Sequence, residues 1–243
     1  MRKEPFVVGD FVHVYNCGNR KMPIVHDEND HWRLLSILRY FNDANSSLNL
    51  LRSLNFSNKL LRSNLNSVDG FAWPKGWPAQ EPLVQIVSYA LMPNHYHLLL
   101  KEIKPGGIAA FMKKLANGYT PYFNIKYDET GKVFQGSYRA RIINGMNYLQ
   151  YIDVYIQILN PFELLTEGMP LNDFDLAFGQ VFESPFSGIG ESLGQRNFSI
   201  LDRADFLRLS NLPTSKEDYK KFARAAIHEQ GLKKFLGGLT LEK

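Results

Sequence analysis

Two histidines, His95 and His97, stand two residues apart in the segment LMPNHYHLLL. The segment is typical of a β-strand, whose side chains alternate between two faces, so both imidazoles should project to the same side. There they could share one divalent metal ion, while Tyr96 would point the other way. An isolated His-x-His pattern is short and common, and it fits two ordinary strand histidines as well. His13, in an earlier predicted strand, could lie near these ligands, although a single strand histidine usually has a packing role.

Two tyrosines occupy a later segment with helical periodicity, NYLQYIDVYIQIL (147–159), which we expect to stop at Asn160-Pro161. Tyr151 and Tyr155 lie one helical turn apart and so share a face of this helix. A tyrosine oxygen can act as a nucleophile that forms a covalent intermediate. For a helical tyrosine taken alone, core packing is the more common role.

Basic residues concentrate between Lys101 and Gly145. This stretch contains eight lysines and arginines but only three acidic residues, so its net charge is +5, compared with +4 for the whole chain. A local basic surface attracts phosphate backbones. The candidate phosphate contacts are Lys113, Lys114, Arg139 and Arg141. Arg139 and Arg141 would share one face of a predicted strand. A solvated helix face is the alternative interpretation of the same charges.

The elements that would position these residues follow the order β–α–β–β–α–β–α. The predicted strands cover 11–16, 83–91, 95–103 and 132–143, and the predicted helices cover 27–42, 108–126 and 147–159. This order predicts an α+β fold: a ferredoxin-like antiparallel sheet (split βαβ) with a tyrosine-bearing helix. A loop-rich insertion at about 43–80 includes a possible short helix at 48–65. Residues 1–165 form the predicted first domain, which contains the histidine and tyrosine motifs, and 166–243 form an accessory C-terminal helical segment with helices at 201–209 and 216–229.

The composition is that of a globular protein, with 44% hydrophobic and 21% charged residues. No run approaches the roughly 20 apolar residues that a membrane helix needs. The single cysteine, Cys17, excludes an intrachain disulfide framework and suits a reducing cytoplasm. We therefore expect a cytoplasmic protein without a membrane partner.

Four segments in order resemble the HUH-type single-tyrosine transposases. They are FVHVYNCGNRKMPIVHDENDHWRLL, LMPNHYHLLL, FMKKLANGYTPYFNIKYDETGKVFQGSYRARII and NYLQYIDVYIQILNP. Within that family the sequence most resembles the transposases associated with repetitive extragenic palindromes. The resemblance covers about residues 11–165, and residues 184–227 more loosely resemble the C-terminal extension of that subgroup.

The resemblance implies a prokaryotic enzyme that cuts and rejoins single-stranded or hairpin DNA through a 5′-phosphotyrosine intermediate. Tyr155 matches the family's nucleophile, with Tyr151 as the alternative. His95 and His97 match the ligands of a divalent ion, Mg²⁺ or Mn²⁺. The family includes dimers as well as monomers, so the resemblance leaves the oligomeric state of this chain open; the palindrome-associated subgroup favours a monomer.

Two positions depart from the family pattern. The family's asparagine follows its tyrosine by four residues, whereas Asn160 follows Tyr155 by five, which in a regular helix moves it about a quarter turn off the face. A distorted last helical turn could return Asn160 to that face. Gln157 is the alternative residue that could supply an oxygen ligand to the metal. Cys17 stands where the family usually has arginine. These departures keep open a second function, a non-catalytic DNA- or RNA-hairpin-binding module of the same fold.

Overall fold

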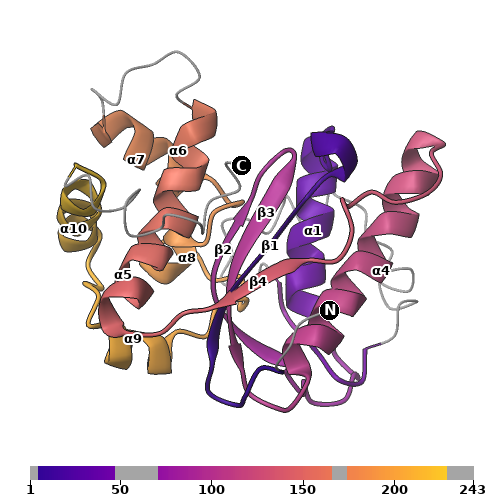
Figure 1. The fold of residues 1–243 in the computed structure, drawn as a ribbon, viewed down its shortest axis with the longest axis horizontal. Coiled ribbons are helices and arrows are strands. Elements are labelled where there is room, and N and C mark those ends of the chain that lie inside the picture. Colours follow the sequence, from indigo (N-terminus) through magenta and orange to yellow (C-terminus); the bar gives the residue numbers. More distant parts are fainter. Residues whose placement is uncertain (1–4, 47–70, 166–173, 229–243) are drawn as a thin grey trace.

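The structure is a computed structural model that describes residues 5–46, 71–165 and 174–228 (Figure 1). Its centre is a four-stranded sheet in the order β2-β3-β1-β4, in which every neighbouring pair is antiparallel. The strands are β1 (Phe11–Cys17), β2 (Val84–Leu91), β3 (His95–Glu102) and β4 (Arg139–Ile142). The predicted α+β class with an antiparallel sheet is confirmed.

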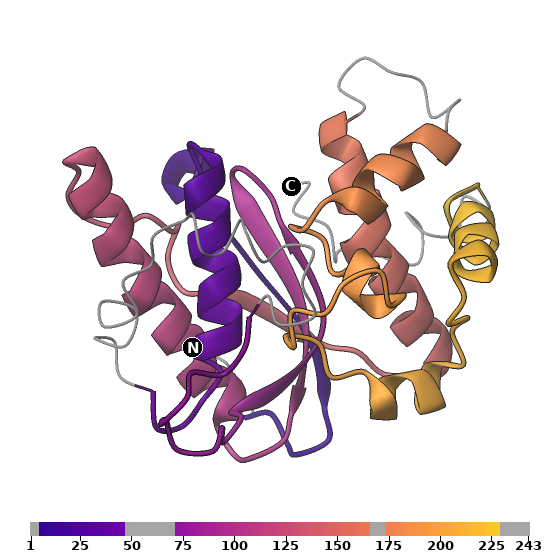
Figure 2. The ribbon, with the colours of Figure 1, turned by 180° about the vertical axis from the view of Figure 1, so that it is seen from behind.

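One face of the sheet is covered by α1 (Glu28–Tyr40) and α4 (Gly107–Tyr127), as Figure 2 shows from behind. Asp27 caps α1 in a capping box with Asp30. The strand residues that alternate toward this face, such as Val12, Val14 and Leu98, are buried against the two helices. The residues that alternate with them along the same strands therefore point toward the second face of the sheet.

The second face is covered by the helix that carries the two tyrosines and by the C-terminal helices (Figure 1). The tyrosine helix consists of α5 (Met146–Val154), a π-helical turn (Tyr155–Leu159) and α6 (Asn160–Leu165). The C-terminal helices are α7 (Phe174–Glu183), α8 (Ile189–Ser192), α9 (Ala204–Ser210) and α10 (Lys216–His228). These elements share one buried apolar cluster, so the predicted C-terminal helices are confirmed.

Three sequence expectations need correction. The strand predicted at 132–143 is continuous only over Arg139–Ile142, because the positive φ of Gly136 interrupts it, and in its first half Phe134 forms an isolated bridge with Gly18. The sequence predicts C-terminal helices only at 201–209 and 216–229, but α7 is a further helix, because its phenylalanines at 174, 178 and 182 follow helical spacing and are buried. The helix predicted to stop at Asn160-Pro161 continues to Leu165.

The continuation past Pro161 has a local explanation. Proline has no N–H, and its ring clashes with the carbonyl four residues earlier, which here belongs to Gln157. The π-helical turn widens the helix at this point, and the Ser187 hydroxyl donates to the Gln157 carbonyl oxygen at 2.8 Å. The C-terminal segment therefore supplies the hydrogen bond that Pro161 cannot.

The predicted helix at 48–65 lies outside the described residues, and the division at residue 165 remains a prediction. Within the described residues, no helix has both the length and the apolar character needed to cross a bilayer.

A buried carboxylate, that of Asp153 in α5, ties the tyrosine helix to its surroundings. It accepts hydrogen bonds from Ser88 of β2, from Gln157 at 3.0 Å and from Tyr219 of α10 at 2.8 Å. Arg203 donates to both of its oxygens, at 2.8 and 3.1 Å. Burial lowers the pKa of Arg203, but the charge and hydrogen bonds of Asp153 raise it further, so the guanidinium remains charged. Sheet, tyrosine helix and C-terminal segment thus meet at one side chain.

We predict that Asp153→Asn lowers the free energy of unfolding by about 3–5 kcal/mol, because it leaves the buried Arg203 charge without its counter-ion. Urea denaturation of the full chain measures this. Asp205→Asn is the matched control, because Asp205 pairs with Lys101 and Arg208 but its side chain is 36% exposed. The loss of stability in this variant should be much smaller, because exposed ion pairs contribute little to folding. Equal losses in the two variants would contradict the importance of the buried network.

Candidate functional site

The two histidines of the His-x-His motif lie on the second face of the sheet, beneath the tyrosine helix. His97 is fully buried, and its ring centroid is 5.1 Å from that of half-buried His95. Nδ1 of His95 is 2.6 Å from Oδ1 of Asn94, the residue before it in the turn that begins β3. This contact uses only one of the two ring nitrogens of His95.

A third histidine, His13 of β1, completes the group. Its Nε2 is 2.8 Å from Nδ1 of His97, and the two rings stack with centroids 5.0 Å apart. Burial, with a smaller contribution from the Arg141 charge, lowers the pKa of His13 to about 3. Burial also lowers the pKa of His97, and both rings are consequently neutral at neutral pH. In such a pair one ring nitrogen donates and the other accepts, so the tautomer of one ring sets that of the other.

Sequence reasoning left the role of His13 open because contact between β1 and β3 depends on their register. The structure pairs Tyr15 with His97 and His13 with Leu99, so the two histidines are diagonal neighbours on one face. Diagonal neighbours in antiparallel strands lie within reach of long side chains. The signal available in the sequence was the shared alternation of the two strands, but it did not give the register.

Tyr155 lies directly over this histidine pair. Its ring meets that of His97 edge-on at a centroid distance of 5.5 Å and that of His13 at 6.0 Å. Tyr155 is 3% exposed. Tyr151, one turn earlier, is half-buried and packs against the apolar cluster of the second face. Of the two candidate tyrosines, Tyr155 is the one whose ring contacts with the histidines define the site.

Asn160 also reaches the site, despite its five-residue spacing from Tyr155. Its backbone N–H donates to the Tyr155 carbonyl, five residues back, which is the hydrogen bond of a π-helical turn. The extra residue of that turn returns Asn160 to the face that a residue four positions on would have in an α-helix. Its Nδ2 also donates to the Tyr155 carbonyl at 3.2 Å, and its side chain hydrogen-bonds to His95.

Gln157, the alternative oxygen ligand, points into different surroundings. Its Nε2 donates to Asp153 at 3.0 Å, and its Oε1 accepts from the Ser192 hydroxyl at 2.8 Å. Both ends of its amide are therefore used by the buried network around Asp153. Asn160, by contrast, contacts a histidine.

The four predicted phosphate contacts separate into two groups. Arg139 and Arg141 are exposed and pair across the sheet with Tyr15 and His13, so they extend the histidine face to the β4 edge. Lys113 is exposed on α4, on the other side of the sheet. The ammonium of Lys114 donates to the carbonyl oxygens of residues 43, 44 and 46. These hydrogen bonds fasten the first residues of the insertion to α4.

The donor set fits a divalent ion that prefers nitrogen and oxygen ligands. Nε2 of His97 is buried and has no hydrogen-bond partner among the described residues. Within the same residues, no three His, Cys, Asp or Glu side chains are grouped to hold a metal ion by themselves. A metal at this place would therefore be held by His95, His97 and the amide oxygen of Asn160. Asn94 and His13 would be the outer partners that orient the two imidazoles.

Residues 79–158 match a family model described as "Transposase IS200 like". The predicted family resemblance is confirmed. The IS200-like segment contains both histidines of the motif and Tyr155, and it ends before Asn160. A solved structure of a REP-associated tyrosine transposase bound to a REP hairpin aligns with 15% identity and a TM-score of 0.39, over 80% of this chain and 85% of that chain. No curated protein matches the chain.

We predict that His13→Phe weakens Mn²⁺ binding by about 10–100-fold, the usual effect of removing an outer partner of a ligating histidine. Phenylalanine keeps a ring in the buried position but offers no hydrogen-bond acceptor to His97. His13→Gln, whose amide oxygen can still accept, should bind Mn²⁺ more tightly than His13→Phe. Isothermal titration calorimetry measures the affinity, and thermal unfolding checks the fold. Wild-type affinity in His13→Phe would contradict the assigned role.

Proposed function

We propose that the protein is a single-tyrosine transposase that cuts and rejoins single-stranded DNA, with Tyr155 as its nucleophile. The observation that carries the proposal is the convergence of Tyr155, His97, His95 and Asn160 at one place on the sheet. The match of residues 79–158 to the IS200-like family supports the same activity. The strand order β2-β3-β1-β4, with β3 between the parallel strands β1 and β2, supports the ferredoxin-like, split βαβ form of this fold.

In the proposed reaction the Tyr155 hydroxyl oxygen attacks a DNA phosphorus. A bond from that oxygen to phosphorus forms while the bond from phosphorus to the preceding 3′ oxygen breaks. The tyrosine loses its proton and the departing 3′ oxygen gains one, so the products are a 5′-phosphotyrosine and a free 3′-hydroxyl. Attack by another 3′-hydroxyl reverses these bond changes and rejoins the DNA. The covalent intermediate divides strand transfer into two phosphoryl transfers.

The proposed cofactor is Mg²⁺ or Mn²⁺, held by His95, His97 and Asn160. Such an ion polarises a phosphoryl oxygen and stabilises the negative charge that develops during transfer. The role of the chain is to hold the two imidazoles neutral and oriented, through Asn94 and His13, and to hold the phenol ring of Tyr155 against them.

The proposed substrate is single-stranded or hairpin-bearing DNA. Arg139 and Arg141 are exposed beside the histidine face, where they can contact the phosphates on either side of the cleaved one. Lys113 is a more remote phosphate contact, and the ammonium of Lys114 would have to leave its carbonyl partners to act as one. We propose that the catalytic unit spans residues 1–165, that 166–243 are accessory, and that the protein acts as a monomer.

We predict that Tyr155→Phe abolishes covalent protein–DNA adducts while retaining the fold and DNA binding, because it removes one oxygen and keeps the ring. Tyr151→Phe should retain adduct formation and lose at most a hydrogen bond's worth of stability, about 1 kcal/mol. Incubation with hairpin-bearing single-stranded DNA and Mn²⁺, followed by denaturing electrophoresis, detects the adduct.

The pair of variants separates the possible failures. Adducts that persist in Tyr155→Phe but vanish in Tyr151→Phe would place the nucleophile one turn earlier. Adducts that persist in both would exclude a single-tyrosine mechanism. DNA binding without adducts in the wild-type chain would instead support the hairpin-binding module.

A further inference from the structure

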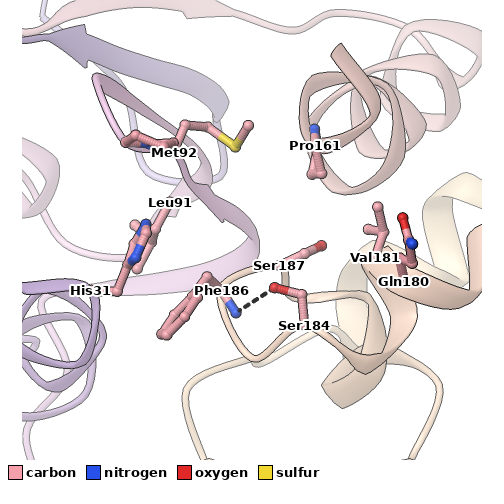
Figure 3. Close-up of a pocket in the computed structure, with 10 residues that line it drawn as sticks. His31, Leu91, Met92, Pro161, Gln180, Val181, Ser184, Phe186 and Ser187 are labelled. Carbon is pink, nitrogen blue, oxygen red and sulfur yellow. Dashed lines mark hydrogen bonds between the residues drawn. The ribbon is translucent and has the colours of Figure 1, made fainter. Parts of the chain in front are cut away.

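A cavity of about 160 Å³ lies beside the proposed active site, between the sheet and the C-terminal segment (Figure 3). Leu91 and Met92 form one side, at the end of β2, and Pro161 and Val181 form the other. Gln180 of α7, Ser184 and Phe186 just after α7, and His31 of α1 also line it. Four stretches of chain that are distant in sequence thus build one small chamber.

The cavity shares its backbone with the proposed metal ligands. Pro161 directly follows Asn160, and Pro93, another lining residue, precedes Asn94 and His95 in the turn. Because consecutive Cα atoms are about 3.8 Å apart, the wall of the cavity begins within one or two residues of each of these ligands. A DNA strand whose phosphate lay at His95 and Asn160 would place its neighbouring bases close to this opening.

The walls suit a neutral flat ring. They are mostly apolar, and the lining contains no Asp, Glu, Lys or Arg side chain. Phe186 is half-buried and stacks on His31 of α1 at 4.3 Å with a 16° angle between the rings. Burial lowers the pKa of His31 to about 4, so this ring too is uncharged at neutral pH. The lining offers no cationic side chain to bind a phosphate, whereas Phe186 and Met92 can contact the face of an aromatic ring.

Phe186 is held in place by hydrogen bonds of the backbone on both sides of its side chain. Leu91 N–H donates to the Phe186 carbonyl at 2.9 Å, which attaches this segment to the edge of β2. The Phe186 N–H donates to the Ser184 hydroxyl at 3.3 Å (Figure 3). A preformed site of this kind loses little conformational freedom when a ligand enters.

We propose that the cavity receives one unpaired nucleobase of the DNA strand, next to the phosphate that Tyr155 attacks. At about 160 Å³ it is smaller than the roughly 300 Å³ lower bound of pockets for drug-sized ligands, so it fits a single ring system rather than a free cofactor. Phe186 and Met92 would contact the face of the base, and the exposed amide of Gln180 can hydrogen-bond to its edge. This inference rests on the proposed function, and it gives the C-terminal segment a direct part in substrate binding.

The test combines abasic DNA with cavity variants. A hairpin-bearing strand that forms the wild-type adduct is prepared with a single abasic site at each position near the cleaved phosphate, and each Kd is measured with the full chain. At one position, loss of the base should weaken wild-type binding by about 10-fold, the scale of one base–aromatic contact. In Phe186→Ala and in Gln180→Ala the same abasic site should cost clearly less, because the lost partner is already absent.

Gln195→Ala is the matched control, an exposed glutamine of the same segment outside the cavity, and it should keep the full abasic penalty. Gln180 is exposed, so Gln180→Ala remains informative if Phe186→Ala does not fold. An abasic penalty that is independent of both Phe186 and Gln180 at every position would overturn the nucleobase site, while adduct formation would leave the proposed function standing. A wild-type chain that forms no adduct with any such strand would overturn the proposed function first.

Discussion

The path of the tyrosine helix through Pro161 is the constraint on which the site depends. The helix must run past a residue without an N–H and still present Tyr155 and Asn160 on one face. The π-helical turn Tyr155–Leu159 meets both demands, since it widens the helix before the proline and adds the residue that realigns Asn160. Such turns are single insertions in α-helices and are frequent at functional sites. Here the Ser187 hydroxyl hydrogen-bonds to the Gln157 carbonyl, to which Pro161 has no N–H to donate.

The same helix is fixed from its other side by buried polar groups. Asp153 receives hydrogen bonds from β2, from its own helix and from Arg203 and Tyr219 in the C-terminal part of the chain. A register shift between Ile86 and Ser88 in β2 accompanies the contact of Ser88 with this carboxylate. Because a charge without its partner in such surroundings is costly, the network strongly favours one placement of the helix. The C-terminal segment therefore helps to position Tyr155.

Residue alternation and the family motif predicted His95, His97 and Tyr155, and the structure brings their rings together, because these predictions depend on local periodicity and short spacing. The strand order also followed from the order of elements. The position of Asn160 did not, since a regular helix turns it away and only the π-helical hydrogen bond brings it back. The contact of His13 with His97 depends on the register between two strands that are distant in sequence. The carbonyl partners of Lys114 come from a loop whose path no local pattern specifies.

The most direct measurement is anomalous diffraction from crystals of the full chain soaked with Mn²⁺. The account predicts one manganese peak in coordination contact with Nε2 of His97, with His95 and with the amide oxygen of Asn160. Tyr155 should lie beside that peak, and Gln157 should remain bonded to Asp153. A peak coordinated by Gln157 instead of Asn160, or one placed away from both histidines, would contradict the account.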